Sequence, residues 1–180
     1  MGIRTSNTCD VVLDDCRIPA SDLLGAEGQG FTIAMKTLDQ ARAWMGCIAT
    51  GIAQRAMEEA IAYGKERVQF GKPILKNQAL QFKVADMAIK IETARQMVAH
   101  TLTLMDQGLP CSKESAIAKC YASDIAMEVA SEAIQMFGGY GYSREYPVEK
   151  LLRDAKIFQI FEGTNEVQRI VVANNTIGKF

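Results

Sequence analysis

The sequence has almost no histidine, and its cysteines lack the pattern of a metal or disulfide site. His100 is the single histidine among 180 residues. One histidine argues against a multi-histidine metal site and against a histidine-dependent catalytic triad, so we interpret His100 as structural and expect no bound metal. The cysteines are odd in number and lack metal-ligand spacing, which is typical of reduced thiols in a cytoplasmic protein. They are Cys9, Cys16, Cys47, Cys111 and Cys120.

The chain also lacks an excess of charge of either sign and a long apolar run. Its formal net charge is −1, so no basic surface suggests a nucleic-acid partner. No apolar run reaches the roughly 20 residues that a membrane span needs, and the first residues do not resemble a secretory signal. With 48% hydrophobic residues, the composition indicates an ordinary globular chain with a substantial core.

The first 26 residues differ from the rest. Apolar and polar residues alternate imperfectly over residues 8–14, which predicts a strand, and Pro19 and Gly25 close the loop after it. One strand is not stable alone, because its backbone groups need a neighbour. No second convincing strand follows, so residues 1–26 are expected to be a piece of sheet whose other strands are absent, followed by a linker.

The remaining residues, 27–180, have helical periodicity. A long segment over residues 29–66 has only glycines as weak interruptions, and residues 76–107 carry apolar residues at alternating steps of three and four. Gly108 and Pro110 end that helix, and Ser112 is expected to cap the next one.

This next helix has its own apolar stripe and ends at Gly138-Gly139. A short helix is predicted near Pro147, and a last one from Asn165 to Ile177. Short links between long amphipathic helices favour antiparallel neighbours. The sequence therefore predicts an all-α fold, an antiparallel up-down four-helix bundle with a short N-terminal β remnant.

Two segments of the first helical region could bind a ligand. Arg42 lies in an apolar stripe after Asp39, where core packing with an ordinary ion pair is the simpler interpretation, although a buried cation needs a partner. Arg67 lies near a helix end, where a guanidinium can hold a phosphate with two hydrogen bonds, and Phe70 offers a stacking face. The same residues also fit a helix C-terminus with favourable cations, so both interpretations stay open.

Two segments nearer the end of the chain are further candidates. The run from Gln135 to Tyr142 has three glycines, Gly138, Gly139 and Gly141, which leave backbone amides open to a ligand. It lacks the ending of a Walker phosphate loop. Glu162 precedes a glycine and a predicted helix, where a carboxylate without a salt-bridge partner can act as a general base, although acidic residues are also common at helix starts.

Together these segments resemble the C-terminal domain of the acyl-CoA dehydrogenases, most closely the short-chain, butyryl-CoA-type members. The resemblance covers essentially the whole chain. It is carried by Glu66-Arg67-x-x-Phe70-Gly71-x-Pro73-Ile74, Gln78, Ala85-Asp86-Met87-Ala88, Gln135-x-x-Gly138-Gly139-x-Gly141-Tyr142, Tyr146-Pro147-Val148-Glu149, Arg153-Asp154-Ala155-Lys156 and Phe161-Glu162-Gly163-Thr164.

The resemblance implies a role for each matching residue. Glu162 would be the base that removes the α-proton of an acyl-CoA thioester while FAD takes the β-hydride, and Gly163 would line the thioester site. Some relatives carry the base at the position of Ala41, where alanine cannot serve, so the base here must be Glu162. Contacts with acyl-CoA are implied for Asp39, Gln40, Ala41 and Arg42. Contacts with the FAD of a neighbouring subunit are implied for Arg67, Phe70, Gln78, Gln135, Met136, Phe137, Gly138 and Gly139. Contacts with the FAD of the same subunit are implied for Thr164, Asn165 and Glu166.

The resemblance further implies a homo-oligomer, a dimer or tetramer, and electron-transferring flavoprotein as electron acceptor. Residues 1–26 would be the remnant of the family's middle β-domain with its linker, and residues 27–180 the helical domain. The family's other domains supply most flavin-ring contacts. The alternative is therefore a catalytically inactive helical module for oligomerisation or binding, and colourless protein that takes up no FAD would favour it.

Overall fold

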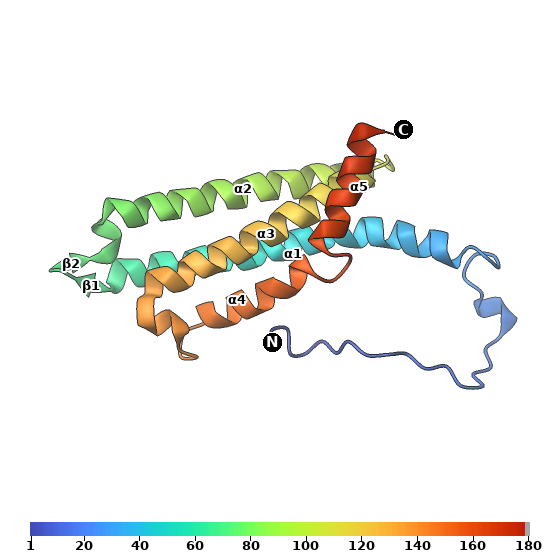
Figure 1. Ribbon diagram of the computed structural model, residues 1–180, viewed down its shortest axis with the longest axis horizontal. Helices are drawn as coiled ribbons and strands as arrows, with labels where there is room; N and C mark the ends of the chain where they lie inside the picture. Colours follow the sequence, from blue (N-terminus) through green and yellow to red (C-terminus); the bar gives the residue numbers. More distant parts are fainter. Residues whose placement is uncertain (179–180) are drawn as a thin grey trace.

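Four helices run alternately up and down and form the body of the molecule (Figure 1). The structure is a computed structural model, and it describes residues 1–178. A fifth helix crosses the bundle at the end where α2 finishes and α3 begins. The helices are α1 (Gly30–Glu66), α2 (Gln78–Asp106), α3 (Ser112–Phe137), α4 (Val148–Lys156) and α5 (Asn165–Ile177). The predicted all-α, antiparallel up-down bundle is confirmed, and the helix bounds agree closely with the periodicity.

Helix α3 lies at the centre and packs against each of the other four helices. Its face toward α1 consists mainly of alanines, and they pack against Ala49, Ala53 and Ala56 of α1, which are all fully buried. A Cβ added at Gly46 of α1 would lie 3.1 Å from the carbonyl oxygen of Ala118. Small residues on both sides therefore let these two helices approach closely, and α3 becomes a rigid support for the elements around it.

A two-stranded hairpin, which periodicity did not predict, joins α1 to α2. Its strands are β1 (Val68–Gln69) and β2 (Lys72–Pro73), and a short 3-10 helix, η2 (Ile74–Lys76), follows. Phe70 and Gly71 form the turn, with φ of 51° and 76°. Two consecutive residues with positive φ are what a tight two-residue hairpin loop requires. The turn leaves the Phe70 ring almost completely exposed.

The expected cap of α3 is wrong, whereas the cap of α5 follows the rule. Cys111 occupies the N-cap position of α3 without a side-chain cap, and Ser112 Oγ instead donates to Asp39 Oδ1 at 3.1 Å. The Ser112 hydroxyl is therefore bonded to a carboxylate of α1 and does not cap α3. At α5 the Thr164 hydroxyl accepts from the backbone N–H of Val167, as an N-cap residue does. The links around α4 are the 3-10 helices η3 (Gly138–Tyr142) and η4 (Ile157–Gln159).

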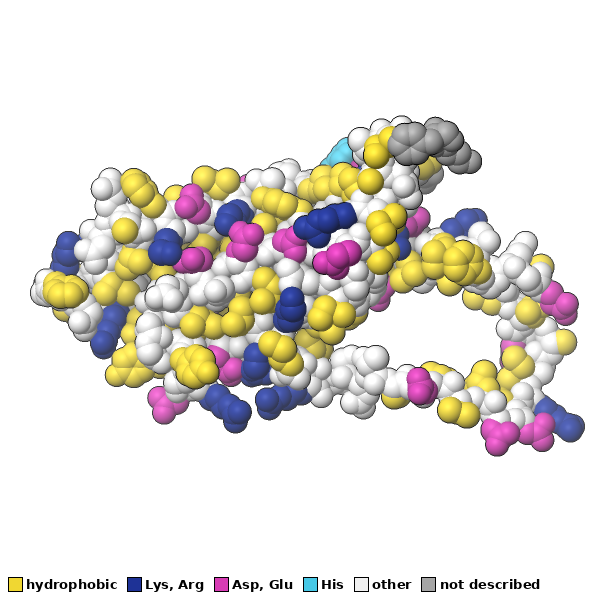
Figure 2. Space-filling model, viewed as in Figure 1, with side chains coloured by type: hydrophobic (Ala, Val, Ile, Leu, Met, Phe, Trp, Pro, Cys, Tyr) yellow, Lys and Arg dark blue, Asp and Glu magenta, His cyan; other side chains and the backbone are white. Residues whose placement is uncertain are grey.

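The predicted strand over residues 8–14 is also wrong. These residues are exposed and form no strand, and the segment contains only one short 3-10 turn, η1 (Ala20–Asp22). The physical reason is the one anticipated above: a strand needs a neighbouring strand, and none lies beside it. The segment arches away from the bundle (Figure 1), and Figure 2 shows apolar side chains along it. The exposed apolar residues include Val11, Val12, Leu13, Ile18, Leu23 and Leu24. The division at residues 26 and 27 stays a prediction.

None of the helices in residues 1–178 is both long enough and apolar enough to cross a membrane. Within the same residues no group of three or more histidine, cysteine, aspartate or glutamate side chains is arranged to hold a metal ion.

Candidate functional site

Glu162 lies in a tight loop between η4 and α5. Its φ is 56° and that of Gly163 is 89°, so two consecutive residues are in the left-handed region. The glutamate side chain is half-buried, and within residues 1–178 no lysine or arginine forms an ion pair with it. The positive φ of Gly163 disfavours any residue with a side chain, and a Cβ there would lie 2.6 Å from Gln168 Nε2, so a substitution would displace that amide. The loop therefore presents a carboxylate that no cation of the described chain neutralises.

Two fully buried side chains hold this loop from beneath. Lys119 of α3 donates from Nζ to the carbonyl oxygen of Gly163 at 2.8 Å, and Gln168 of α5 donates from Nε2 to the same oxygen at 2.9 Å. Gln168 Nε2 also lies 3.3 Å from the carbonyl oxygen of Glu162. The sequence analysis missed both residues. The available signal was a lysine at helical spacing from Ala116 and Ala122, on a face of α3 that is otherwise made of small residues.

Burial lowers the pKa of Lys119 to about 8. The main cause is the loss of hydration of the ammonium group. The positive charge of nearby Arg42 lowers the pKa further, and the negative charge of Asp124 offsets part of the decrease. The charge of Arg42 on α1 thus acts on Lys119, whose ammonium group donates to the loop that carries Glu162.

Asn165, the first residue of α5, connects the loop to α3 through several hydrogen bonds. Its Oδ1 accepts from Lys119 Nζ at 2.8 Å, and its Nδ2 donates to Ser123 Oγ at 2.8 Å and to Asp124 Oδ1 at 2.7 Å. Asp124 in turn pairs with Arg169 at 2.8 Å. The Asn165 side chain is buried and occupied by these contacts, whereas Thr164 is half-buried and Glu166 is exposed. The proposed contacts of these three residues with FAD stay predictions.

The α1 segment contains a buried arginine with a carboxylate partner, as the core interpretation required. Arg42 Nη1 lies 2.7 Å from Asp39 Oδ1, and Arg42 is 7% exposed. Its Nε atom is buried and has no hydrogen-bond partner among the described residues. Gln40 is exposed and Ala41 is half-buried. Asp39 and Gln40 line an open hollow of about 430 Å³ together with the α2–α3 link.

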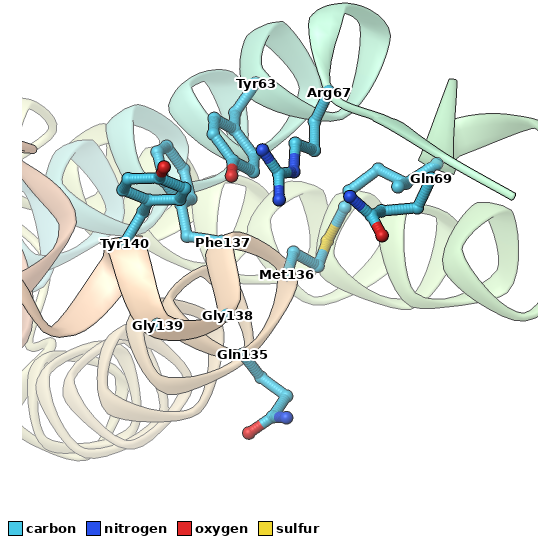
Figure 3. A pocket seen from close by; sticks show the side chains of 10 residues that line it. Tyr63, Arg67, Gln69, Gln135, Met136, Phe137, Gly138, Gly139 and Tyr140 are labelled. Carbon is cyan, nitrogen blue, oxygen red and sulfur yellow. The ribbon is translucent and has the colours of Figure 1, made fainter. Parts of the chain in front are cut away.

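A second hollow, of about 470 Å³, lies at the other end of α3 (Figure 3). The Arg67 guanidinium points into it and lies 5.4 Å from the centre of the Tyr140 ring. The Gln135 side chain points away from Arg67, and Phe137 stacks on Tyr63 with ring centres 4.1 Å apart. The complete lining is Tyr63, Arg67, Gln69, Ile74, Gln135, Met136, Phe137, Gly138, Gly139 and Tyr140.

The predicted cofactor residues are thus brought together only in part. Arg67 and the Gln135–Gly139 segment line one hollow, whereas Phe70 lies exposed on the hairpin and Gln78 lies exposed at the start of α2. The sequence analysis assigned no role to four lining residues, namely Tyr63, Gln69, Ile74 and Tyr140. Gln69 and Ile74 belong to the segment around Arg67, and Tyr140 belongs to the run from Gln135 to Tyr142, so proximity along the chain was the signal for these three.

Comparison with known proteins places these features in context. The family model described as acyl-CoA dehydrogenase, C-terminal domain, matches residues 28–177. The "Acyl-CoA dehydrogenase, short-chain specific" of Megasphaera elsdenii is 53% identical over 171 residues, which are 95% of this chain and 45% of that protein. The chain spans about half the length of the curated relatives it matches.

Two solved structures are similar throughout. The butyryl-CoA dehydrogenase of Megasphaera elsdenii superposes with a TM-score of 0.91 at 51% identity, and the match covers 93% of this chain and 44% of that one. A chain from a structure described as the electron transferring flavoprotein of Acidaminococcus fermentans gives a TM-score of 0.92 at 52% identity, with the same two coverages.

Proposed function

Because the chain belongs to the acyl-CoA dehydrogenase family and corresponds to its C-terminal domain, we propose that it forms the C-terminal part of an FAD-dependent enzyme. This enzyme oxidises a short-chain acyl-CoA to the 2,3-enoyl-CoA. Glu162 removes the α-proton, and FAD, when bound, supplies the acceptor for the β-hydride. The observation that carries the proposal is the placement of Glu162 on a tightly held loop without a cationic partner among the described residues.

The surroundings of Glu162 suit a base that acts on carbon. A carboxylate paired with lysine or arginine is a poorer base, because the cation stabilises its ionised form. Lys119, the nearest buried cation on α3, donates to backbone and amide oxygens instead. The Glu162 carboxylate therefore stays available to substrate. Asp39 lines the hollow at the α2–α3 link, where it can contact the acyl-CoA, and the buried Arg42 pairs with it.

The residues around the other hollow fit a cofactor that carries phosphates and an aromatic ring. The Arg67 guanidinium is free of any recorded carboxylate partner in residues 1–178 and points into the hollow. Gly138 and Gly139 have open space where a Cβ would lie, so a ligand can approach their backbone. Lys119 and Gln135 are separated by roughly 24 Å along α3 at 1.5 Å per residue. This separation supports a homo-oligomer in which Arg67 serves the FAD of a neighbouring subunit.

We also propose electron-transferring flavoprotein as the partner that reoxidises the enzyme. The similar structure from Acidaminococcus fermentans is described by that partner's name. The alternative function is an inactive helical oligomerisation or binding module. Purified protein that stays colourless after incubation with FAD would support it.

The proposal is tested in a full-length form, in which residues 1–180 follow the N-terminal portion that the longer relatives have. Anaerobic mixing with butyryl-CoA is followed by the bleaching of flavin absorbance. Glu162→Gln keeps the size and polarity of the side chain but cannot accept the proton, so the rate should fall at least ~10²–10⁴-fold while FAD stays bound. Glu145→Gln, on an exposed loop, is the matched control and should bleach normally. Normal bleaching by Glu162→Gln would overturn the assignment of the base.

A further inference from the structure

The backbone on the C-terminal side of Glu162 is held by side chains of two different helices. The Gly163 carbonyl oxygen accepts hydrogen bonds from Lys119 of α3 at 2.8 Å and from Gln168 of α5 at 2.9 Å. The Glu162 carbonyl oxygen lies 3.3 Å from Gln168 Nε2. Lys119 and Gln168 are both fully buried. Two consecutive peptide groups of the loop are therefore fixed by donors that solvent does not reach.

The loop needs such support because of its backbone conformation. Glu162 has φ of 56°, a region that residues with a side chain rarely occupy, and Gly163 has φ of 89°. A residue stays in this region only where the surroundings impose it. Rotation of the Glu162–Gly163 unit would move the carboxylate and would break the hydrogen bonds to Lys119 and Gln168. The two donors and the position of the carboxylate are thus mechanically linked.

Packing alone does not explain a lysine at position 119, because burying its charge is unfavourable. A buried ammonium loses hydration, and within the described residues Lys119 has no carboxylate within ion-pair distance. Its recorded partners are the oxygens of Gly163 and Asn165, one on each side of Thr164. Both belong to the turn that leads from Glu162 into α5. The ammonium group donates only to this turn. An apolar side chain would fill the same volume without loss of hydration.

We propose that Lys119 and Gln168 form a carbonyl clamp that positions the carboxylate of Glu162 for proton removal. The inference rests on the proposed role of Glu162 as the base. Lys119 and Gln168 are positioning residues, because they act through the backbone of the loop and not on the substrate.

The clamp is tested with variants that remove the donors and keep the shape. Lys119→Met and Gln168→Met are made in the full-length form, and the flavin reduction rate is measured per bound flavin at saturating butyryl-CoA. A displaced base should slow reduction by roughly 10- to 100-fold, because a shift of about 1 Å has effects of this size. The butyryl-CoA concentration at half-saturation and the FAD content should change little. Val129→Ala removes buried volume from the same helix α3 away from the loop, and it should leave the per-flavin rate unchanged.

A second measurement does not depend on activity. Amide hydrogen exchange of the 180-residue chain should accelerate over residues 161–165 in Lys119→Met and in Gln168→Met, but not in Val129→Ala. If one variant fails to fold, the other answers the question. Wild-type reduction rates in the donor variants would overturn the clamp, whether or not exchange changes. A rate loss that Val129→Ala shares would overturn it as well, because the effect would then be general destabilisation.

The failure of the clamp is distinguishable from failure of the proposed function. Glu162→Gln is run beside the clamp variants. Normal reduction by Glu162→Gln removes the premise. Blocked reduction by Glu162→Gln with normal reduction by Lys119→Met and Gln168→Met leaves Glu162 as the base and rejects the clamp alone.

Discussion

The backbone N–H of Ile3 donates to Asp154 Oδ1 at 2.7 Å, across 151 residues of sequence. The same helix, α4, holds the preceding residues: Arg153 Nη1 donates to the Met1 carbonyl oxygen at 2.8 Å. Gly2 lies so close that a Cβ there would be 2.2 Å from the Arg153 carbonyl oxygen. The start of the chain is therefore docked on the bundle, although most of the segment that follows it is exposed.

Asp154→Asn should weaken this docking. Burial raises the pKa of Asp154, but the hydrogen bonds from Lys150 and from the Ile3 N–H outweigh it, and the net pKa is lowered. A carboxyl group with a lowered folded-state pKa stabilises the fold above its unfolded pKa of about 3.9, and this stabilisation is lost as the pH falls through the folded value. We expect the variant to lose about 1.5–3 kcal/mol of unfolding free energy at pH 7, as for a hydrogen bond to a charged group.

Urea unfolding at pH 7 and pH 3 measures the effect. The difference between wild type and Asp154→Asn should shrink at the lower pH, because below the unfolded-state pKa the unfolded wild-type chain binds a proton that the folded carboxylate resists. Asp10→Asn, in the exposed part of the N-terminal segment, is the control and should unfold like wild type at both pH values. An equal loss from Asp154→Asn at both pH values would contradict the role of the charged hydrogen bonds.

Lys119 predicts a pH dependence of the same sign in an alkaline window, because its folded-state pKa is also lowered. Its folded pKa, about 8, lies below the ordinary value of 10.5, so between these values the unfolded chain binds a proton that the folded chain does not. Stability therefore rises with pH across this window as far as Lys119 is concerned. We expect wild type to gain about 1–3 kcal/mol relative to Lys119→Met between pH 7 and pH 10, at about 1.4 kcal/mol per pKa unit. Urea unfolding of both proteins at the two pH values checks this, and a constant difference would show that Lys119 titrates normally.

Much of the fold could be predicted because its determinants are local. The apolar steps of three and four, the stop at Gly108 and the start after Pro147 each depend on neighbours within one or two turns of helix. The hairpin could not be found in this way, since its turn places Phe70 at positive φ, and an aromatic residue in the sequence does not indicate that conformation. Ser112 failed as a cap for a related reason: its partner, Asp39, is 73 residues away.

The residues of the candidate site likewise fall into those that a local motif reveals and those that only tertiary contacts reveal. Glu162 and Gly163 could be found because a motif of adjacent residues carries them. Lys119 was missed although it lies on a small-residue face of α3, because a lysine inside a helix is taken for a solvated charge unless its burial is known. Gln168 has the same difficulty, since its amide reaches backward to the loop before α5. The support of the site depends on tertiary contacts, and only the structure supplies them.

Arg67→Ala should weaken the retention of FAD in the full-length form, because it removes the guanidinium that points into the hollow of Figure 3. Repeated gel filtration followed by the ratio of flavin to protein absorbance measures the retention. Arg55→Ala is the control, since Arg55 lies on α1, the helix that ends just before Arg67, is exposed and pairs with Glu59. Equal flavin content in both variants would remove Arg67 from the cofactor site.

The proposed sharing of Arg67 between subunits has a consequence that mixing can reveal. If each site combines Glu162 of one subunit with Arg67 of its neighbour, a dimer of Glu162→Gln with Arg67→Ala contains one site with both defects and one site with neither. Co-expression of the two variants should restore roughly a quarter of wild-type sites, since half of randomly formed dimers are mixed and each has one intact site. If Arg67 acts within its own subunit, every site keeps one defect and nothing is restored. Flavin bleaching by butyryl-CoA in the co-expressed protein, compared with a mixture of the two separately purified variants, decides between these arrangements.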